Sequence, residues 1–431
     1  MQDSTTDFRK LWSEIGVDLD LHDQLMAGLD RVFTHTHLWQ KDRPASMSLF
    51  DKAFHDSHAG RVAEIAAYRA KGGKSVGTFC IYVPDEIALA AGVLPIPLCG
   101  GSGWAVDHAD RMFPRDICPL VRSTFGMSFS NTCPYKKLKD FAVGETTCDA
   151  KKKAWDLLGF LSLEIPQKKN PIDRQLWLSE VERFRGEMEK LSGRAVTAEA
   201  LASSIRLVNN KRRLLQRING FRKLDEPPIS GLDALLVSQA ALNMDVEAFN
   251  AAAGVLVAEL EERASKGVSA YSMPGPRVLF AGSPSPMGFA KTHYVVESSG
   301  LRIVADESCT GMRYFRDLVD EGASSLEDMI SAIADRYFSI DCACFSPNSE
   351  RMDNVAALLP EYRVQGVIHG ILQYCHGYDI EAKALDKVLS AAGVPSLKIV
   401  ADYGEQDEEQ IRVRVEAFRE LLAVGGGITT G

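Results

Sequence analysis

Cysteines are the residues of this chain whose type and placement could do chemistry, and nine of them occur. The pattern is clearest from Gly144 to Lys153, where an apolar run leads to Cys148 and a capped, basic helix is expected to follow. Cys118, 30 residues upstream, opens another expected helix. Cys344 and Cys375, 31 residues apart, repeat this arrangement in the C-terminal third. We therefore expect the duplicated cysteines to converge on one iron–sulfur site.

A cysteine thiol needs a reason to lose its proton at neutral pH, because its ordinary pKa is about 8.5. A bound metal supplies that reason, and the positive end of a helix beginning after Cys118 or Cys148 adds to it. Structural zinc sites usually carry tight pairs with two residues between the cysteines, whereas Cys342 and Cys344 are separated by one. Ligands scattered over two domains favour an iron–sulfur cluster. The alternative is that these cysteines are small buried hydrophobic residues, and their positions argue against it.

The elements that must position the cysteines are short β-type runs alternating with helices, from Val76 onward and again from Arg277. This alternation predicts α/β domains with parallel sheets and right-handed crossovers. Functional groups in such sheets gather beyond the carboxyl ends of the strands. Six cysteines follow expected strands or begin helices on that side: Cys99, Cys118, Cys148, Cys309, Cys344 and Cys375. Each domain thus supplies a trio, and we expect the two trios to face one another across a cleft.

The hydrophobic periodicity divides the chain into four parts. They are a helical N-terminal region (1–72), a first cluster-binding α/β domain (73–165), a helical connector (166–270) and a second cluster-binding α/β domain (271–431). Pro95 and Pro97 are awkward for a central strand in the run expected from Val93 to Cys99. In the connector, the basic run 211–213 is most simply interpreted as the solvated face of a helix.

The remaining candidates are weaker. Cys133 follows the helix that begins at Cys118, so we expect it at the opposite end of the strands and leave it out of the site. Cys80 and Cys342 are either neighbours of the site or structural residues. Among polar residues, the candidates for proton transfer or substrate orientation are Glu145 and Glu307, which precede cysteines at strand ends, and His376, which follows Cys375.

Composition excludes several classes of function. The net charge of −9 argues against nucleic-acid binding as the main role. No apolar stretch reaches the length of about 18 residues that a membrane span needs. The start of the chain has neither the basic nor the apolar region of a signal peptide, so a cytoplasmic protein is expected. Convincing nucleotide-binding loops are also missing, since Gly73-Lys74-Ser75 lacks the required earlier glycine.

Three segments carry a resemblance to a known family. They are Cys118-Pro119-Leu120-Val121-Arg122-Ser123, Glu145-Thr146-Thr147-Cys148-Asp149 and Leu372-Gln373-Tyr374-Cys375-His376. They resemble the D-component of 2-hydroxyacyl-CoA dehydratases and the related benzoyl-CoA reductase subunits, over about residues 74–422. The resemblance implies an α/β fold with two Rossmann-like (flavodoxin-like) domains. It also implies one 4Fe–4S cubane held by the matching cysteines, Cys118, Cys148 and Cys375.

The chain is richer in cysteine than a dehydratase subunit and is most similar to the branch called double-cubane-cluster proteins. Marks of that branch include Leu98-Cys99-Gly100-Gly101, Cys309-Thr310-Gly311 and Ile340-Asp341-Cys342-Ala343-Cys344. The resemblance implies an eight-iron, nine-sulfide cluster, in which two cubanes share a sulfide and each is held by three cysteines. For the second cubane, topology favours Cys99, Cys309 and Cys344; Cys80, Cys133 and Cys342 stay open as replacements.

The resemblance also implies partners. Members of the family receive low-potential electrons from a separate ATP-hydrolysing reductase with its own 4Fe–4S cluster, and homodimers are usual in this branch. We expect reduction of a small unsaturated molecule. Two alternatives stay open, namely a 2-hydroxyacyl-CoA dehydratase subunit with a single 4Fe–4S cluster and a non-catalytic electron-transfer protein.

Overall fold

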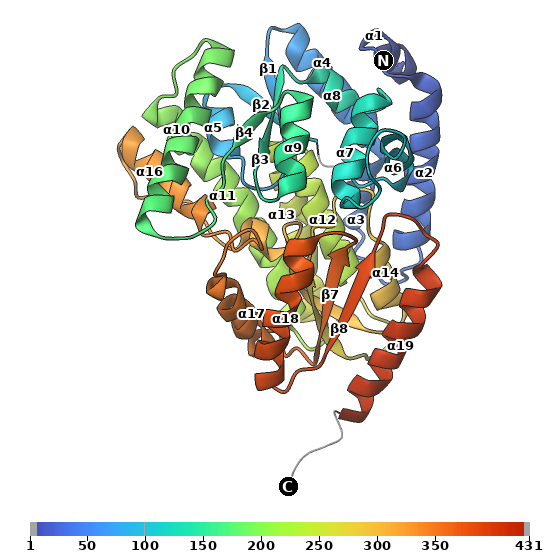
Figure 1. The fold of residues 1–431 in the computed structure, drawn as a ribbon. Coiled ribbons are helices and arrows are strands. Elements are labelled where there is room, and N and C mark those ends of the chain that lie inside the picture. Colours follow the sequence, from blue (N-terminus) through green and yellow to red (C-terminus); the bar gives the residue numbers. More distant parts are fainter. Residues whose placement is uncertain (1–6, 99, 426–431) are drawn as a thin grey trace.

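Two parallel four-stranded sheets form the framework of the protein, one in the upper and one in the lower half of Figure 1. The computed structural model describes residues 7–98 and 100–425. The first sheet has the order β2-β1-β3-β4, and the second has the corresponding order β6-β5-β7-β8. The strands are β1 (Lys74–Thr78), β2 (Val93–Pro97), β3 (Phe141–Glu145), β4 (Leu161–Leu163), β5 (Arg277–Gly282), β6 (Arg302–Glu307), β7 (Gly366–Leu372) and β8 (Ser396–Ala401). The predicted α/β class with two parallel-sheet domains is confirmed.

The prolines of β2 are explained by its place in the first sheet. β2 pairs with β1 alone, from Lys74 opposite Val93 to Thr78 opposite Pro97, and lies at the edge of the sheet. Proline cannot donate a hydrogen bond to a neighbouring strand and is therefore tolerated at an edge. The strand itself was predicted, whereas the short strand β4 and the helix after residue 102 were not.

Helices surround both sheets. Those before β1 are α1 (Phe8–Glu14), α2 (Leu19–His37), α3 (Met47–His55), η1 (Asp56–His58) and α4 (Gly60–Ala70). Those of the first sheet are α5 (Asp85–Ala90), α6 (Gly103–Ala109), α7 (Pro119–Phe129), α8 (Pro134–Leu138) and α9 (Asp149–Leu158). Helix α2 runs along one side of the molecule and contacts α6 of the first half and α14 (Lys291–Ser298) of the second (Figure 1).

Helices also fill the sequence between the two sheets and follow the strands of the second. The first set is α10 (Pro171–Ser192), α11 (Ala198–Gly220), η2 (Phe221–Lys223), α12 (Gly231–Asn243) and α13 (Val246–Ser265). Besides α14, the second set is α15 (Met312–Phe315), α16 (Leu326–Phe338), α17 (Ser349–Glu361), α18 (His376–Ala391) and α19 (Glu408–Gly425). The largest hydrophobic core is continuous across the halves, since it contains Val76 and Val143 of the first sheet and Ile371 of the second. Among the described residues, no helix has the length and apolar character that crossing a membrane requires.

The interpretation of residues 211–213 as a solvated face is wrong for two of the three. Lys211 and Arg212 are buried because α11 packs against α5, whose first turn carries two carboxylates. Lys211 Nζ lies 3.2 Å from Asp85 Oδ2, and Arg212 Nη1 lies 2.6 Å from Glu86 Oε1. Arg213 is the exposed member, paired at 2.7 Å with Glu321. The basic run thus joins the connector to the first half.

Replacing Lys211 with methionine is expected to lower the free energy of unfolding by about 1–3 kcal/mol, because the partly buried Asp85 loses its partner. The matched variant Arg213→Met removes an exposed pair and should cost less than about 1 kcal/mol. Anaerobic urea unfolding of both variants measures the contrast. Equal decreases in the free energy of unfolding would show that the buried pair of Lys211 contributes no more than the exposed pair of Arg213.

Candidate metal centre

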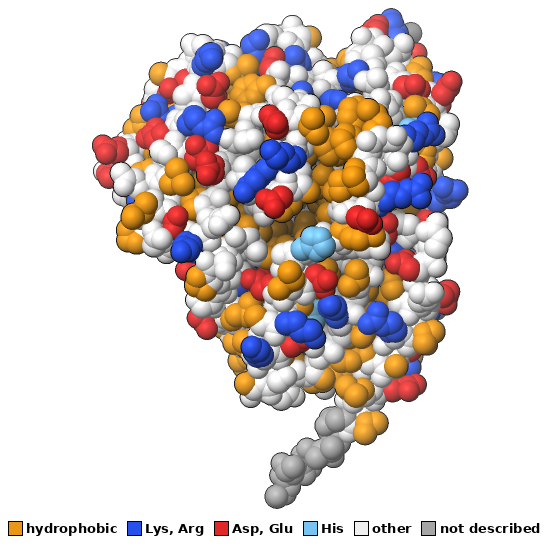
Figure 2. Space-filling model, in the orientation of Figure 1, with side chains coloured by type: hydrophobic (Ala, Val, Ile, Leu, Met, Phe, Trp, Pro, Cys, Tyr) orange, Lys and Arg blue, Asp and Glu red, His pale blue; other side chains and the backbone are white. Residues whose placement is uncertain are grey.

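Four described cysteines lie just beyond the carboxyl ends of strands. Cys80 follows β1 and Cys148 follows β3 in the first half, and Cys309 follows β6 and Cys375 follows β7 in the second. Because parallel strands present their carboxyl ends on one edge, each sheet brings its cysteines together. The backbone of Cys80 is left-handed, with φ of 61°, so the chain turns sharply right after β1. The space-filling view shows a hollow between the halves, with side chains of the hydrophobic class, cysteine included, in its depth (Figure 2).

The first group of cysteines contains Cys118, Cys148 and Cys375, the three residues that the family resemblance puts on one cubane. The thiol of Cys118 is hydrogen-bonded to Cys375 across the two halves. Cys148 lies close to both, since its charge acts on Cys118 and the charge of Cys375 acts on Cys148. The hydrogen bond from Cys118 lowers the pKa of Cys375 to about 7 and raises the pKa of Cys118. The structure therefore brings a predicted trio together, with Cys375 as its favoured thiolate.

Helix starts favour thiolates in this first group. Cys118, Cys148 and Cys375 are the N-cap residues of α7, α9 and α18. The three sulfurs do not accept a regular N-cap hydrogen bond. Backbone N–H groups in the first turn of each helix lie near the sulfur, however, and lower the pKa of the thiol. Cys148 is exposed as a residue, yet desolvation of its sulfur is the main influence and raises the pKa, while Lys151 lowers it.

The second group contains Cys80, Cys309, Cys342 and Cys344. Cys80 is hydrogen-bonded to Cys309 and Cys344 to Cys342, so the group consists of two linked pairs. The hydrogen bond from Cys80 and the charge of Arg313 lower the pKa of Cys309 to about 6, against the effect of burial. Cys344 likewise lowers the pKa of Cys342. Each pair therefore holds one favoured thiolate.

Two buried tyrosines join the pairs of the second group. The Tyr378 hydroxyl lies 3.9 Å from Cys309 Sγ and 3.6 Å from Cys342 Sγ. Burial first, and then the charges of all four cysteines, raise the pKa of Tyr82. Cys80 and Cys342 thus lie inside this group. Their positions in the sequence were the available signal, since Cys80 follows the run that forms β1 and Cys342 lies two residues before Cys344. Cys99, the remaining predicted ligand, lies outside the described residues.

Lys151 and Glu145 lie between the two groups. The Lys151 ammonium lowers the pKa of Cys148 and Cys375 in the first group and of Cys309 in the second. It forms an ion pair with the fully buried Glu145, whose Oε1 also accepts a hydrogen bond of 2.9 Å from the Thr147 hydroxyl. Glu145 Oε2 has no hydrogen-bond partner in the described part of the chain. This places the predicted Glu145 beside the cysteines.

Glu307 ends β6, two residues before Cys309, and lies in a buried network of charges. It forms ion pairs with the buried residues Arg313 and Arg351, the latter at 3.0 Å. Arg313 also lies 3.1 Å from Asp341 Oδ1, and its Nη1 lies 3.5 Å from Cys309 Sγ. Both carboxylate oxygens of Glu307 are therefore engaged in a charge network that supports Cys309. A direct role for Glu307 in proton transfer stays a prediction.

His376, a predicted site residue, and Cys133, which was left out of the predicted site, differ in exposure. His376 is exposed as the first residue of α18, directly after Cys375. Cys133 packs with Val62, Ile65 and Leu138, and burial raises the pKa of its thiol, with no other cysteine among the influences on it. Cys133 also lines the cavity described below, and leaving it out of the cluster site stays a prediction.

The residues present fit an iron–sulfur cluster. The donors are thiols in two groups of three and four, and Cys309, Cys342 and Cys375 have lowered pKa values, which metal binding requires. In the ranges 7–98 and 100–425, no three His, Cys, Asp or Glu side chains are close enough to hold a single metal ion. A cubane instead takes each thiolate on a different iron, so its ligands surround a cluster rather than one ion.

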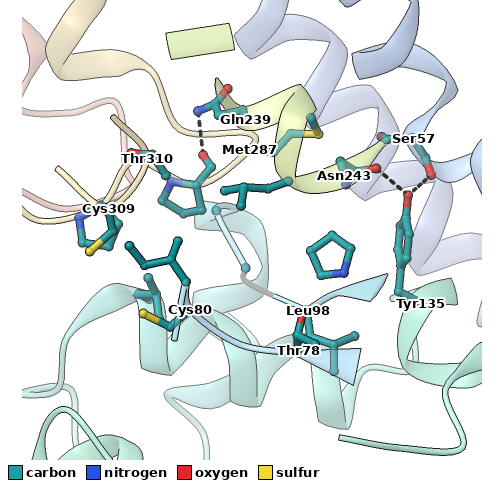
Figure 3. A pocket seen from close by; sticks show the side chains of 18 of the residues that line it. Ser57, Thr78, Cys80, Leu98, Tyr135, Gln239, Asn243, Met287, Cys309 and Thr310 are labelled. Carbon is teal, nitrogen blue, oxygen red and sulfur yellow. Dashed lines mark hydrogen bonds between the residues drawn. The ribbon is translucent and has the colours of Figure 1, made fainter. Parts of the chain in front are cut away.

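A cavity of about 150 Å³ extends from the second cysteine group into the molecule (Figure 3). Cys80 and Cys309 lie at one end, and Tyr135 and Asn243 lie at the other, with Leu98 and Met287 between them. The cavity combines residues of the first half, the N-terminal helices, α12 and the loop after β5. It is therefore a product of the tertiary structure.

Two α/β halves with cysteines at facing strand ends define a class of protein that has a thiol-lined site between two lobes. The match to known proteins is specific: residues 80–422 match the family model for the D-component of 2-hydroxyglutaryl-CoA dehydratase, and the chain belongs to this family. It is 33% identical to YjiM of Escherichia coli, a protein named as a dehydratase subunit, over 88% of this chain and 99% of that protein.

Relatives with other named activities are more distant. A benzoyl-CoA reductase subunit from Thauera aromatica is 27% identical over 80% of this chain and 89% of that protein. The beta subunit of (R)-2-hydroxyglutaryl-CoA dehydratase from Acidaminococcus fermentans is 23% identical over 88% of this chain and 100% of that protein. Relatives of the chain are thus named as components of dehydratases and of a reductase, and the chain belongs to a family of such components.

Proposed function

We propose that the protein carries a double-cubane cluster of eight irons and nine sulfides and reduces a small unsaturated substrate. Electrons of low potential come from a separate ATP-hydrolysing reductase of the activator type, and the protein acts as a homodimer. The observation that carries the proposal is the second cysteine group, Cys80, Cys309, Cys342 and Cys344, beside the first. A single cubane held by the first trio would leave these four thiols without a role.

Each cubane is assigned three cysteines of this chain. Cys118, Cys148 and Cys375 hold the first, in agreement with their association across the halves. Cys309 and Cys344 belong to the predicted second trio, whose third member is Cys99. Because Cys80 and Cys342 are hydrogen-bonded to those two residues, they are the competing ligands.

The bound cluster would supply low-potential electrons to an unsaturated bond. The chain's own residues offset charge and supply protons. Lys151 places a positive charge near both cysteine groups, and its pair with Glu145 holds a proton where water has little access. His376, exposed beside Cys375, is the candidate that exchanges protons with solvent.

The second candidate function is a 2-hydroxyacyl-CoA dehydratase subunit with one 4Fe–4S cluster. The names of the relatives favour it. The cavity favours a small substrate instead, since its charged lining residues in the described part of the chain are Lys151 and Asp85, each paired with an opposite charge. Coenzyme A carries several phosphate charges, which such a lining does not complement.

Anaerobic purification with quantification of iron and acid-labile sulfide tests the proposal. We expect about eight irons per chain, loss of iron in air, and no saturable binding of an acyl-CoA. About four irons per chain together with acyl-CoA binding would establish the dehydratase function instead. Full iron content without substrate reduction, when the ATP-dependent reductase is supplied, would indicate an electron-transfer protein.

A further inference from the structure

The cavity next to the second cysteine group has an apolar middle and a polar far end. Figure 3 shows the sulfurs of Cys80 and Cys309 on one side and the Tyr135–Asn243–Ser57 contact on the other. Gln239 lies on the same helix as Asn243, but its amide is already hydrogen-bonded within the cavity wall. Its Nε2 donates to the carbonyls of Ser285 and Pro286 at 2.8 and 3.0 Å. These hydrogen bonds join α12 to the loop after β5 along the wall of the cavity.

The polar end is built from three uncharged groups. The Tyr135 hydroxyl contacts the Ser57 carbonyl and lies 3.0 Å from Asn243 Oδ1. Asn243 is half-buried, and within the described residues its Nδ2 makes no hydrogen bond. Because the hydroxyl holds one half of the carboxamide, the other half is left to pair with a molecule in the cavity. An amide that lines a cavity in this way loses hydrogen bonding unless a ligand or water restores it.

The charges near this end are neutralised and lie outside the cavity lining. Arg61 Nε donates to the Asn243 carbonyl at 3.1 Å, its Nη1 pairs with Glu64 at 3.1 Å, and neither residue is among the described residues that line the cavity. His58 lines this end, and burial, its main influence, lowers the pKa of that ring to about 3, so the ring is neutral. Burial likewise raises the pKa of Tyr135. A charged ligand bound here would lose part of its hydration without gaining a counter-charge, which is costly. The chemistry of the polar end therefore fits an uncharged ligand.

We propose that this cavity binds a small uncharged molecule whose reacting part meets the cysteine end and whose single hydrogen-bonding group pairs with the Asn243 carboxamide. The identity of the cysteine end as the reacting end rests on the proposed function. Apolar cavities of about 150 Å³ bind benzene-sized molecules. The cysteine end of this cavity adjoins the proposed cluster, so the ligand is at most about that size. Asn243 is then a specificity-determining residue.

Two ring compounds of nearly equal shape test the proposal, namely cyclopentanol and methylcyclopentane. A hydroxyl both donates and accepts, so it pairs with either half of the carboxamide, whereas the methyl group does neither. Binding to the anaerobically purified protein is measured by saturation-transfer NMR titration. In Asn243→Leu we expect cyclopentanol to bind about 2- to 10-fold more weakly and methylcyclopentane to bind unchanged or more tightly.

Asn250→Leu is the matched control, since Asn250 lies on α13 outside the cavity lining and should leave both affinities unchanged. Tyr135→Phe is the second variant, which keeps the ring and releases the carboxamide, and a smaller loss for cyclopentanol alone is expected. Equal weakening of both probes in both cavity variants, or no binding of either probe to the unaltered protein, would overturn the proposal. Iron content and the EPR spectrum are measured on the same samples, so a failure of the cluster assignment is seen separately.

Discussion

Replacing Cys375 with serine is expected to remove about half of the bound iron and to lower substrate reduction at least about 100-fold. Cys375 has a pKa lowered to about 7 and is hydrogen-bonded to Cys118 across the two halves. A serine hydroxyl occupies nearly the same space but keeps its proton at neutral pH and is a poor ligand for iron. The first cubane therefore loses a ligand from the second half while the fold keeps its packing.

Anaerobic iron and sulfide quantification, together with EPR of the reduced protein, measures this effect. Cys148→Ser should act in the same direction, because it removes a member of the same trio from the first half. Cys133→Ser is the matched control, since Cys133 packs among apolar residues and has no cysteine neighbour that acts on its pKa. Full iron content in Cys375→Ser, or equal iron loss in Cys133→Ser, would refute the ligand assignment.

Replacing Arg313 with methionine is expected to destabilise the protein by about 3–5 kcal/mol, because it leaves buried carboxylates without their counter-ion. Arg313 is fully buried and forms ion pairs with Glu307 and, at 3.1 Å, with Asp341. The loss of stability should lie near the lower end of this range, because both carboxylates keep another partner. Glu307 remains paired with Arg351, and Asp341 remains paired with Arg316 at 2.7 Å. The hydrogen bond from Cys80 is the main cause of the lowered pKa of Cys309, and the same change removes a second cause, the charge of Arg313.

Anaerobic urea unfolding and iron quantification separate the two consequences. Arg363→Met is the control, because Arg363 forms an exposed pair with Asp225 and should cost at most about 1 kcal/mol. We expect Arg313→Met to lose iron from the second cubane and to keep the EPR signal of the first. A stability change no larger than that of the control would show that the Glu307 network tolerates the loss of its central cation.

The sequence by itself determined the α/β class and the positions of the strand-end cysteines. These are local consequences of chain chemistry, because alternating apolar runs form strands and Pro119 directly after Cys118 fixes a helix start. Topology brings the strand-end residues of one sheet together on one edge, which predicts a trio of cysteines from each domain. The grouping of Cys118 and Cys148 with Cys375 of the other half followed from the family resemblance instead. Leaving Cys133 out of the site could also be argued from its place after α7.

Only the tertiary structure decided how the two halves meet. Lys211 and Arg212 are buried because α11 packs against Asp85 and Glu86, and a basic run carries no local sign of distant carboxylates. The pairing of Cys80 with Cys309 joins residues of different halves, and the left-handed backbone at Cys80 has no signal in its residue type. The cavity that ends at Asn243 is likewise built from segments far apart in sequence. Hydrophobic periodicity reports which face of an element is buried, whereas long-range packing determines what that face meets.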